Sequence, residues 1–442
     1  MFRKNQRIWL RSTVLVFAIN CAWAQQIPST QRVSSSGSTV QATQGSSLGS
    51  PLTLKQAFDA AWQRQPEAKS QLIRQSAAIA RSQAANNWLP EPVVFEVSGK
   101  TDRLNKNQGS REFVAGVSIP LWLPGERAGT AALADAEMRS AVSRISAAQL
   151  RTAASVREAY WLWHRTRIEH EVASDRLRSA QQLAMDVTKR VKAGDLAKSD
   201  QYQADGAMAS AEVALAEAWG SVLTASQQLR MLVGEAGYSA TVPASETVIK
   251  AESVPEFSGN SSVLLDKHPA LTELLDRSET AQRHAELVLS QSRANPELSL
   301  AMSRDKGQAT DPYQQAITVG MRIPFGADNR NRAKAATAQA ESIEARTAAS
   351  MEKERLVAQL DAARQRLESV QVQETAANKR AQLAKELRGF IQKSFRLGES
   401  DLPTRLRIES EAIEAERQAA RVRVDLAAAV SALRQALGLL PT

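Results

Sequence analysis

The side chains best suited to metal binding or nucleophilic catalysis are few in this 442-residue chain, which has four histidines and a single cysteine. His164 and His170 are six residues apart and therefore do not share one face of a helix. The sequence contains no HExxH motif, no glycine-rich phosphate loop and no nucleophile–base pair, and Cys21 alone cannot form a disulfide framework or a cysteine-ligated metal site. We therefore expect no enzymatic activity and no catalytic, metal-binding or cofactor-binding residues, and we expect the histidines, which include His268 and His284, to be solvated or structural.

Acidic residues follow two glycines that interrupt long helical stretches. Gly194 precedes Asp195 and Asp200, and Gly398 precedes Asp401. Glycine permits the left-handed turn that ends a helix, and an acid at the start of the next helix stabilises its free N–H groups, so helix capping is one interpretation. The functional alternative is that several copies of the chain gather around an axis, where these acids would form rings that attract cations.

The N-terminus has the layout of a signal for export. Residues 1–24 contain four Arg or Lys residues, an apolar stretch and the small-x-small sequence Ala22-Trp23-Ala24, as in a secretory signal peptide. Its removal lowers the net charge from +9 to +5 and takes Cys21 away; the alternative is a lipoprotein acylated at Cys21. Export excludes nucleic acid as a natural partner, despite a sequence pI of about 9.7. Residues 25–51, rich in Ser, Gln, Thr and Gly, are expected to form a flexible linker.

The rest of the chain contains the same unit twice. Ser118-Ile119-Pro120 is matched by Arg322-Ile323-Pro324, and Ala193-Gly194-Asp195 by Leu397-Gly398-Glu399, both 204 residues further on. A constant offset of this size indicates a doubled domain rather than an array of short repeats. We place the first repeat at 52–235, a connector at 236–262 and the second repeat at 263–440.

Each repeat contains two short segments that are expected to be strands; the first of them, Val93 to Lys100, is short and rich in β-prone residues. Phe113, Ala115, Val117, Ile119 and Leu121 follow a period of two, which predicts a strand with one apolar face. The second repeat has the same pattern. The expected strands cover about 93–100, 112–121, 297–304 and 313–323.

Two very long helices follow the expected hairpins. Both stretches lack proline and are rich in Ala, Glu, Gln, Arg and Leu, which favours helices over about 128–191 and 329–395. The first would be about 96 Å long, too long for a globular domain of this size to cover. Leu356, Leu360, Ala363, Leu367 and Val370 are spaced by three or four residues, a heptad pattern that indicates coiled-coil partners.

The strands would have to cross any membrane that this chain spans. Mean hydropathy is −0.33, and no uncharged apolar run approaches the ~18 residues of a membrane helix. Four strands cannot close a barrel, because spanning barrels have at least about eight, and an open sheet in lipid would leave unpaired edges. Three copies would supply twelve strands. The alternative is a set of soluble β-ribbons at the end of a coiled-coil fibre.

Five segments resemble the TolC-type outer-membrane efflux family. They are LTLKQAFDAAWQRQPEA (52–68), VSIPLWLPGERAGTAALADAE (117–137), AGDLAKSD (193–200), VGMRIPFGADNRNRAKAATAQAE (319–341) and RLGESDLP (396–403). The resemblance spans residues 52–440. It implies a mainly α fold with a small β part: a homotrimer with a periplasmic α-helical barrel continuous with a 12-stranded β-barrel in the outer membrane of a Gram-negative bacterium.

The resemblance also implies partners. Family members contact outer-membrane lipid and couple to an inner-membrane pump through a periplasmic adaptor protein. The segment PLWLPGER (120–127) is similar to members that serve heavy-metal cation pumps of the resistance–nodulation–division type, so metal cations are the expected cargo. The alternatives are the same channel for drugs, organic compounds or type I protein secretion, or, in another class, a periplasmic coiled-coil adaptor or scaffold.

Roles for particular residues follow from the same resemblance. Asp195 and Asp200 at the first helical-hairpin end are gate candidates, as are Thr404 and Arg407, which occupy positions where the archetypal member has two acids. An acidic gate at the second end is therefore doubtful, and Arg407 is expected to form ion pairs with the first end of a neighbouring copy. The expected adaptor contacts are Gly194, Leu196, Leu397, Gly398 and Leu402. Trp88 and Trp122 are expected to anchor the protein at the membrane interface.

Overall fold

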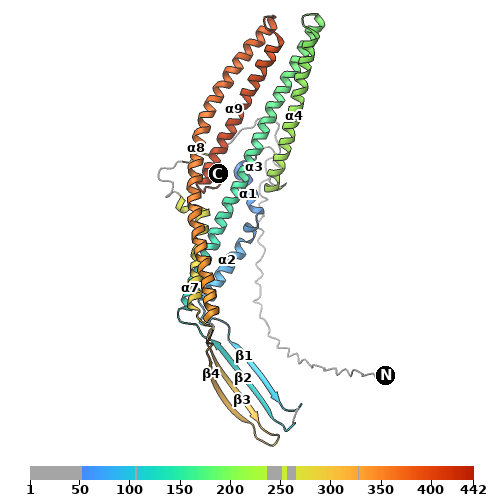
Figure 1. The fold of residues 1–442 in the computed structure, drawn as a ribbon. Helices are drawn as coiled ribbons and strands as arrows, with labels where there is room; N and C mark the ends of the chain where they lie inside the picture. Colours follow the sequence, from blue (N-terminus) through green and yellow to red (C-terminus); the bar gives the residue numbers. More distant parts are fainter. Residues whose placement is uncertain (1–51, 105–106, 236–250, 256–264, 327) are drawn as a thin grey trace, which may run out of the picture. The chain divides into compact units, whose positions relative to one another are not determined.

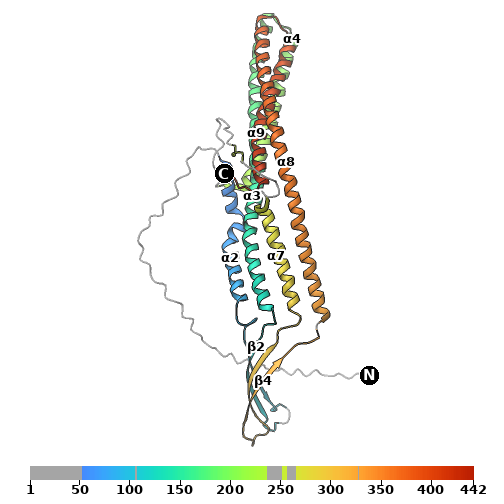
Figure 2. The same cartoon turned by 90° about the vertical axis from the view of Figure 1, so that its left-hand side faces the viewer.

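The computed structural model describes residues 52–104, 107–235, 251–255, 265–326 and 328–442 (Figures 1 and 2). The expected signal peptide and linker lie outside the described residues, as does most of the expected connector. The first repeat comprises α1 (Leu54–Arg64), α2 (Pro66–Ala85), β1 (Val94–Thr101), β2 (Arg111–Pro120), α3 (Glu126–Ala193) and α4 (Lys198–Val233). The second comprises η1 (Leu265–Lys267), α7 (Pro269–Ser290), β3 (Glu297–Lys306), β4 (Gln314–Arg322), α8 (Asp328–Leu397) and α9 (Leu402–Ala436).

The two repeats are not identical at their starts. The first helical stretch is broken into α1 and α2 at Gln65, whose backbone is extended. The break comes directly before Pro66, which lacks an N–H and disfavours a helical conformation in the residue before it. In the second repeat the counterpart of α1 is the three-residue turn η1, and Pro269 begins α7.

The long helices form two antiparallel hairpins. α3 packs against α4 and α8 against α9, while α2 and α7 flank the part of α3 nearer the strands (Figures 1 and 2). α3 ends at Gly194 and α8 at Gly398, and both glycines have positive φ angles, 88° and 81°. An L side chain is strained in this region, so glycine lets the chain reverse there. The hairpin ends lie at the opposite end of the helices from the sheet.

The four strands form one antiparallel sheet in the order β1-β2-β3-β4. The central pairing joins the repeats, because β2 of the first repeat pairs with β3 of the second, with Val117 opposite Leu300. β1 and β4 are the edges. The fold class expected from the sequence is confirmed for the chain itself: a mainly helical protein with a duplicated unit and a small antiparallel sheet.

The main core lies where α1, α3, α4 and α9 meet. Tyr160, Trp161 and Trp163 are buried there with Leu229 and Val424. The indole N–H of Trp161 donates a hydrogen bond to the hydroxyl of Ser431 on α9, at 2.9 Å. These aromatic residues therefore pack the core rather than line a ligand cage.

A buried ion cluster ties the connector to both repeats. Glu252, in the described piece of the connector, accepts hydrogen bonds from Arg157 of α3 (2.9 Å) and Arg434 of α9 (3.1 Å). The hydroxyl of Ser431 donates a hydrogen bond to the second carboxylate oxygen of Glu252, at 2.5 Å. All three charged side chains are buried. The three charged side chains depend on one another, because the loss of one of them leaves a buried charge uncompensated.

Replacing Glu252→Ala should therefore destabilise the fold strongly. We expect the free energy of unfolding to fall by about 3–5 kcal/mol, measured by urea unfolding followed by far-ultraviolet circular dichroism. Glu279→Ala is the control, since it breaks the partly exposed pair with Arg139 (2.6 Å) and should cost at most about 1 kcal/mol. Equal losses for the two variants would contradict a special role for the buried cluster.

Candidate functional site

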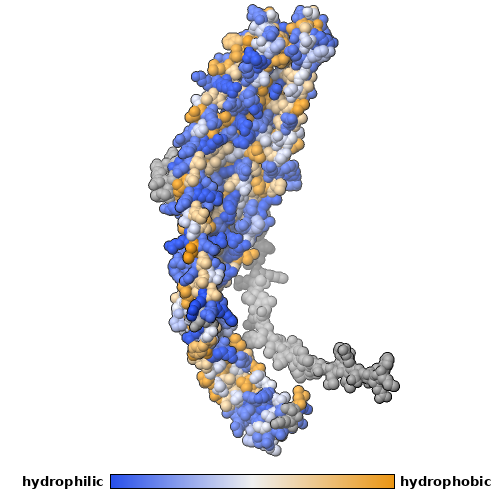
Figure 3. Space-filling model, in the orientation of Figure 1, coloured by the Kyte–Doolittle hydropathy of each residue, from blue (hydrophilic) through white to orange (hydrophobic). Residues whose placement is uncertain are grey.

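The sheet carries its apolar side chains on the exposed face. Residues directly opposite each other on paired strands point to the same face, so the register defines two faces. The apolar face consists of Phe95, Val97, Phe113, Ala115, Val117, Ile119, Leu298, Leu300, Met302, Ile317, Val319 and Met321. Figure 3 shows hydrophobic residues gathered over the strands. Val319, in the middle of β4, is 69% exposed.

The other face of the sheet is more polar, and along β3 it is less exposed. It includes Ser98, Ser118, Ser299, Ser303 and Thr318. In β3 each residue of the apolar face from Leu298 to Arg304 is more exposed than its neighbours on the opposite face. This is the reverse of a sheet that covers a water-soluble core, and it suits a wall with apolar surroundings on one side and water on the other.

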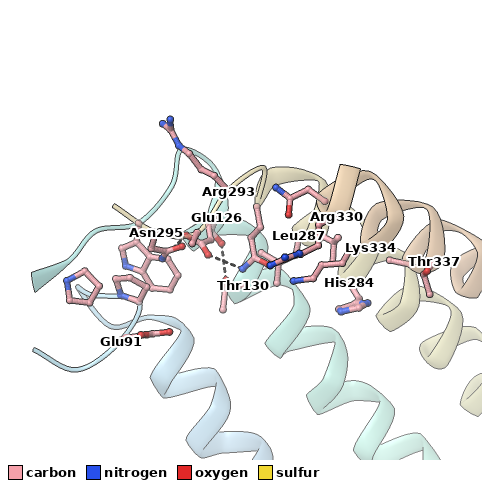
Figure 4. Close-up of a pocket in the computed structure, with 18 of the residues that line it drawn as sticks. Glu91, Glu126, Thr130, His284, Leu287, Arg293, Asn295, Arg330, Lys334 and Thr337 are labelled. Atoms are coloured by element: carbon pink, nitrogen blue, oxygen red, sulfur yellow. Dashed lines mark hydrogen bonds between the residues drawn. The ribbon is translucent and has the colours of Figure 1, made fainter. Parts of the chain in front are cut away.

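Beyond this sheet, the strand-to-helix junction lines an open cavity of about 1100 Å³ (Figure 4). Glu126, at the first position of α3, is buried against it. Its carboxylate accepts hydrogen bonds from Gln291 (2.7 Å) and Asn295 (3.1 Å), and from the backbone N–H of Leu123 at 2.9 Å. One carboxylate thus fixes both the β2–α3 and the α7–β3 connections. This role of Glu126 was not among the expectations from the sequence, although an acid in the first helical turn after Pro-Gly is a usable signal.

The two expected interface anchors lie in different surroundings. Trp88 is 89% exposed, as an anchor requires. Trp122 instead lines the junction cavity, and its indole N–H is buried without a hydrogen-bond partner among the described residues. The chain leaves β2 at Pro120 and turns across the junction, where the backbone N–H of Leu121 donates to Pro296. This turn places Trp122 inward, so the expectation of an outward anchor is not met there.

Two of the acidic residues at the hairpin ends, Asp200 and Asp401, lie at the starts of helices. The first tip (193–200) and second tip (396–403) are the two turns between the long helices. Asp200 accepts a hydrogen bond from the backbone N–H of Ala197 (3.1 Å) at the start of α4. Asp401 is the residue before α9, and a hydrogen bond from the Thr404 side chain lowers the pKa of its carboxyl. Asp195 is exposed just beyond Gly194.

Arg407 is engaged within its own helix. Its guanidinium pairs with Glu411 one turn further along α9, at 2.8 Å, and its side chain is 62% exposed. Within the described chain it does not pair with an acid of the first tip. It is nevertheless accessible to a neighbouring copy.

The residues expected to contact an adaptor fall into two groups. Gly194, Gly398 and Leu397 are exposed, the last at 75%, and Leu196 is partly buried. Leu402 is only 2% exposed, within a cluster that includes Phe395. The side chain of Leu402 packs inside the second tip and is not exposed for direct contact, so its expected docking role stays a prediction.

A contact that the sequence analysis did not find joins the two hairpins near these tips. The guanidinium carbons of Arg190 and Arg405 are 4.9 and 4.6 Å from the centroid of the buried Phe395 ring. Asp186 is 3.7 Å from Arg190 and 3.6 Å from Arg405. Burial lowers the pKa of Arg405, and Asp186 opposes this effect. Nothing in the local sequence signals this contact, because the four residues lie on three helices.

The histidines show no shared site. His164 lies among Tyr160, Trp161 and Trp163, and burial followed by the nearby charge of Arg167 lowers its pKa to about 4. His268 is also buried, and burial lowers its pKa. In the part of the chain that the structure describes, no three His, Cys, Asp or Glu residues are grouped as metal ligands. No helix in the described ranges is both long and apolar enough to cross a membrane.

A sequence match now gives these features a context. Residues 57–235 match the family described as outer membrane efflux protein. This matched stretch, which covers most of the first repeat, is similar to members of that family. The family match supports the expected outer-membrane location. No curated protein matches the chain by sequence.

Solved structures extend the likeness to both repeats. The structure of CusC has 17% sequence identity and a TM-score of 0.74, covering 89% of this chain and 93% of that one. The *Campylobacter jejuni* outer membrane channel CmeC has 15% identity and a TM-score of 0.71, covering 87% and 85%. The *Vibrio cholerae* outer membrane protein VceC has 16% identity and a TM-score of 0.70, covering 87% and 96%. At these identities the likeness establishes a shared fold.

Proposed function

We propose that three copies of this chain form an outer-membrane efflux channel. The observation that carries the proposal is the reversed sheet: its apolar face is exposed on all four strands, and along β3 the polar face is the less exposed one. Its edges, β1 and β4, have no further strand beside them in the described chain. In lipid, each unpaired backbone group costs several kcal/mol, so the sheet must be closed by other copies.

Pairing β4 of one copy with β1 of the next would remove both edges. Three copies give twelve strands, within the range of known membrane barrels and wide enough for an aqueous lumen. Exposed apolar residues on the long helices suggest that these too are covered by neighbours. On α8 they include Ile343, Met351, Val372, Leu383 and Phe390.

The helical hairpins would then extend into the periplasm as a tunnel. The exposed groups at their ends, Gly194, Leu397 and Gly398 with the partly buried Leu196, are the proposed contacts for a periplasmic adaptor. Leu402 would support this surface from inside. Through the adaptor the channel would serve an inner-membrane pump, for which we propose the resistance–nodulation–division type.

Cations are the proposed cargo, and heavy-metal cations in particular. The polar face of each sheet carries four acids and two bases, namely Glu96, Glu112, Glu297, Asp305, Lys100 and Arg322. Lining the lumen, this face would favour cations over anions. The similarity of segment 120–127 to the heavy-metal branch of the family supports metals over drugs or organic compounds.

The proposal that the apolar face of the sheet contacts lipid is tested by introducing an arginine on each face separately. Val319→Arg places a cation on the apolar face and should cost about 2–4 kcal/mol near the bilayer midplane, reducing the yield of folded trimer. Thr318→Arg, the adjacent residue on the polar face, is the matched control and should assemble normally. The yield is measured as heat-modifiable migration of detergent-extracted membranes. Equal assembly of both variants, or extraction without detergent, would contradict a lipid-facing sheet.

The tips are tested through Arg407. We propose that it pairs with Asp195 or Asp200 of a neighbouring copy and holds the periplasmic end closed, with Thr404 beside it. Arg407→Asp would replace attraction by repulsion and should raise single-channel conductance in planar bilayers. Arg417→Asp changes the same charge further along α9, where Arg417 pairs with Glu414 (2.9 Å), and should leave conductance unchanged. An unchanged conductance for Arg407→Asp would remove the proposed gate.

The cargo is tested in cells that lack this protein. Deleting the gene should lower the concentration of heavy-metal salts that the host tolerates and should raise cell-associated metal, measured by mass spectrometry. Tolerance of hydrophobic drugs should stay unchanged. The reverse pattern would assign the same channel to drugs or organic compounds and would contradict the metal proposal.

A further inference from the structure

Three basic side chains occupy the far end of the apolar face. In the register of the sheet, Arg111 is directly opposite Lys306, and Arg304 lies two residues from Lys306 on the same face. Tyr313, just before β4, lies beneath both β3 cations: the guanidinium carbon of Arg304 is 4.4 Å and the ammonium of Lys306 5.3 Å from its ring centroid. We call Arg111, Arg304 and Lys306 with Tyr313 the basic rim.

The basic rim has no acidic counterpart on its own face. None of the strand residues that share this face is an acid, and none of the three cations forms an ion pair with a described acid. The ammonium of Lys306 donates only to the backbone carbonyl of Ala309, at 3.4 Å. Like charges directly opposite each other destabilise a sheet, so Arg111 and Lys306 need an external anion.

Charge at this level of the sheet is separated by face. In the neighbouring row, Lys100, Glu112 and Asp305 point to the polar face, and Lys100 pairs with Glu112 at 4.0 Å. If both faces were in water at this end of the sheet, the acids would not need to be confined to one face. The division places cations alone on the side where lipid would lie.

The distance from the helices fits a headgroup position. Along β2 the apolar face runs from Ile119 to Phe113, and Arg111 follows as its next residue. Six residues of strand span about 20 Å, close to the height of the apolar band of a membrane barrel. Tyr313 at the same end matches the aromatic residues that lie at membrane interfaces.

We propose that the basic rim binds the phosphate groups of a lipid headgroup in the outer leaflet. The inference rests on the proposed function, which makes the apolar face lipid-facing. Guanidinium groups bind phosphate oxygens in bidentate fashion, and three cations in one patch suit a headgroup with more than one phosphate. Each trimer would hold such lipids around its outer circumference.

The test measures lipid binding to detergent-extracted trimers by native mass spectrometry. The probes are diphosphoryl lipid A and its monophosphoryl counterpart. We expect wild type to bind the diphosphoryl form at least about tenfold more tightly than the variant Arg111→Gln/Arg304→Gln/Lys306→Gln. Lys100→Gln, in the adjacent row on the polar face, is the matched control and should bind like wild type. The monophosphoryl form should bind wild type more weakly.

Two outcomes would overturn the proposal. One is equal binding of the diphosphoryl form to wild type and the triple variant. The other is full competition by inorganic phosphate at the lipid's concentration, which would assign the rim to free anions. Intact trimers that fail this test would refute the lipid site and leave the channel standing. Failure to obtain any membrane-embedded trimer would refute both.

Discussion

Unpaired backbone groups along β1 and β4 are the constraint on which the rest of this structure depends. A four-stranded sheet whose apolar side chains are exposed cannot be stable alone in water, and its open edges cannot be stable alone in lipid. In the proposed channel, closure with further copies of the chain solves both problems. The long helices raise the same requirement, because residues such as Met351 and Phe390 remain exposed on α8.

The two repeats have to be held in a fixed relation for such closure to be regular. The β2–β3 pairing joins them within the sheet, and Glu252 joins them again through Arg157 and Arg434. Glu126 adds a third constraint, since it fixes the turn from β2 into α3 against the α7–β3 connection. The strands therefore leave the helices in one direction and one order.

Charge follows the same division as hydrophobicity. The polar face of the sheet has more acids than bases, whereas the apolar face ends in Arg111, Arg304 and Lys306. In the proposed channel, the first set would act on the cargo and the second on the membrane. Near the hairpin ends, Arg190 and Arg405 with Phe395 bring the two helical hairpins together within one chain.

The sequence by itself determined the repeating pattern of elements. Period-two alternation located the strands to within about two residues, and the lack of proline located the long helices, because both signals are local properties of the chain. The tertiary structure alone decided which side chains meet. Leu402 turned out to be buried, Trp122 faces a cavity, and Glu252 binds two arginines from different repeats. These contacts join residues far apart in the chain, and the spacing of residues along the sequence carries no information about such pairings.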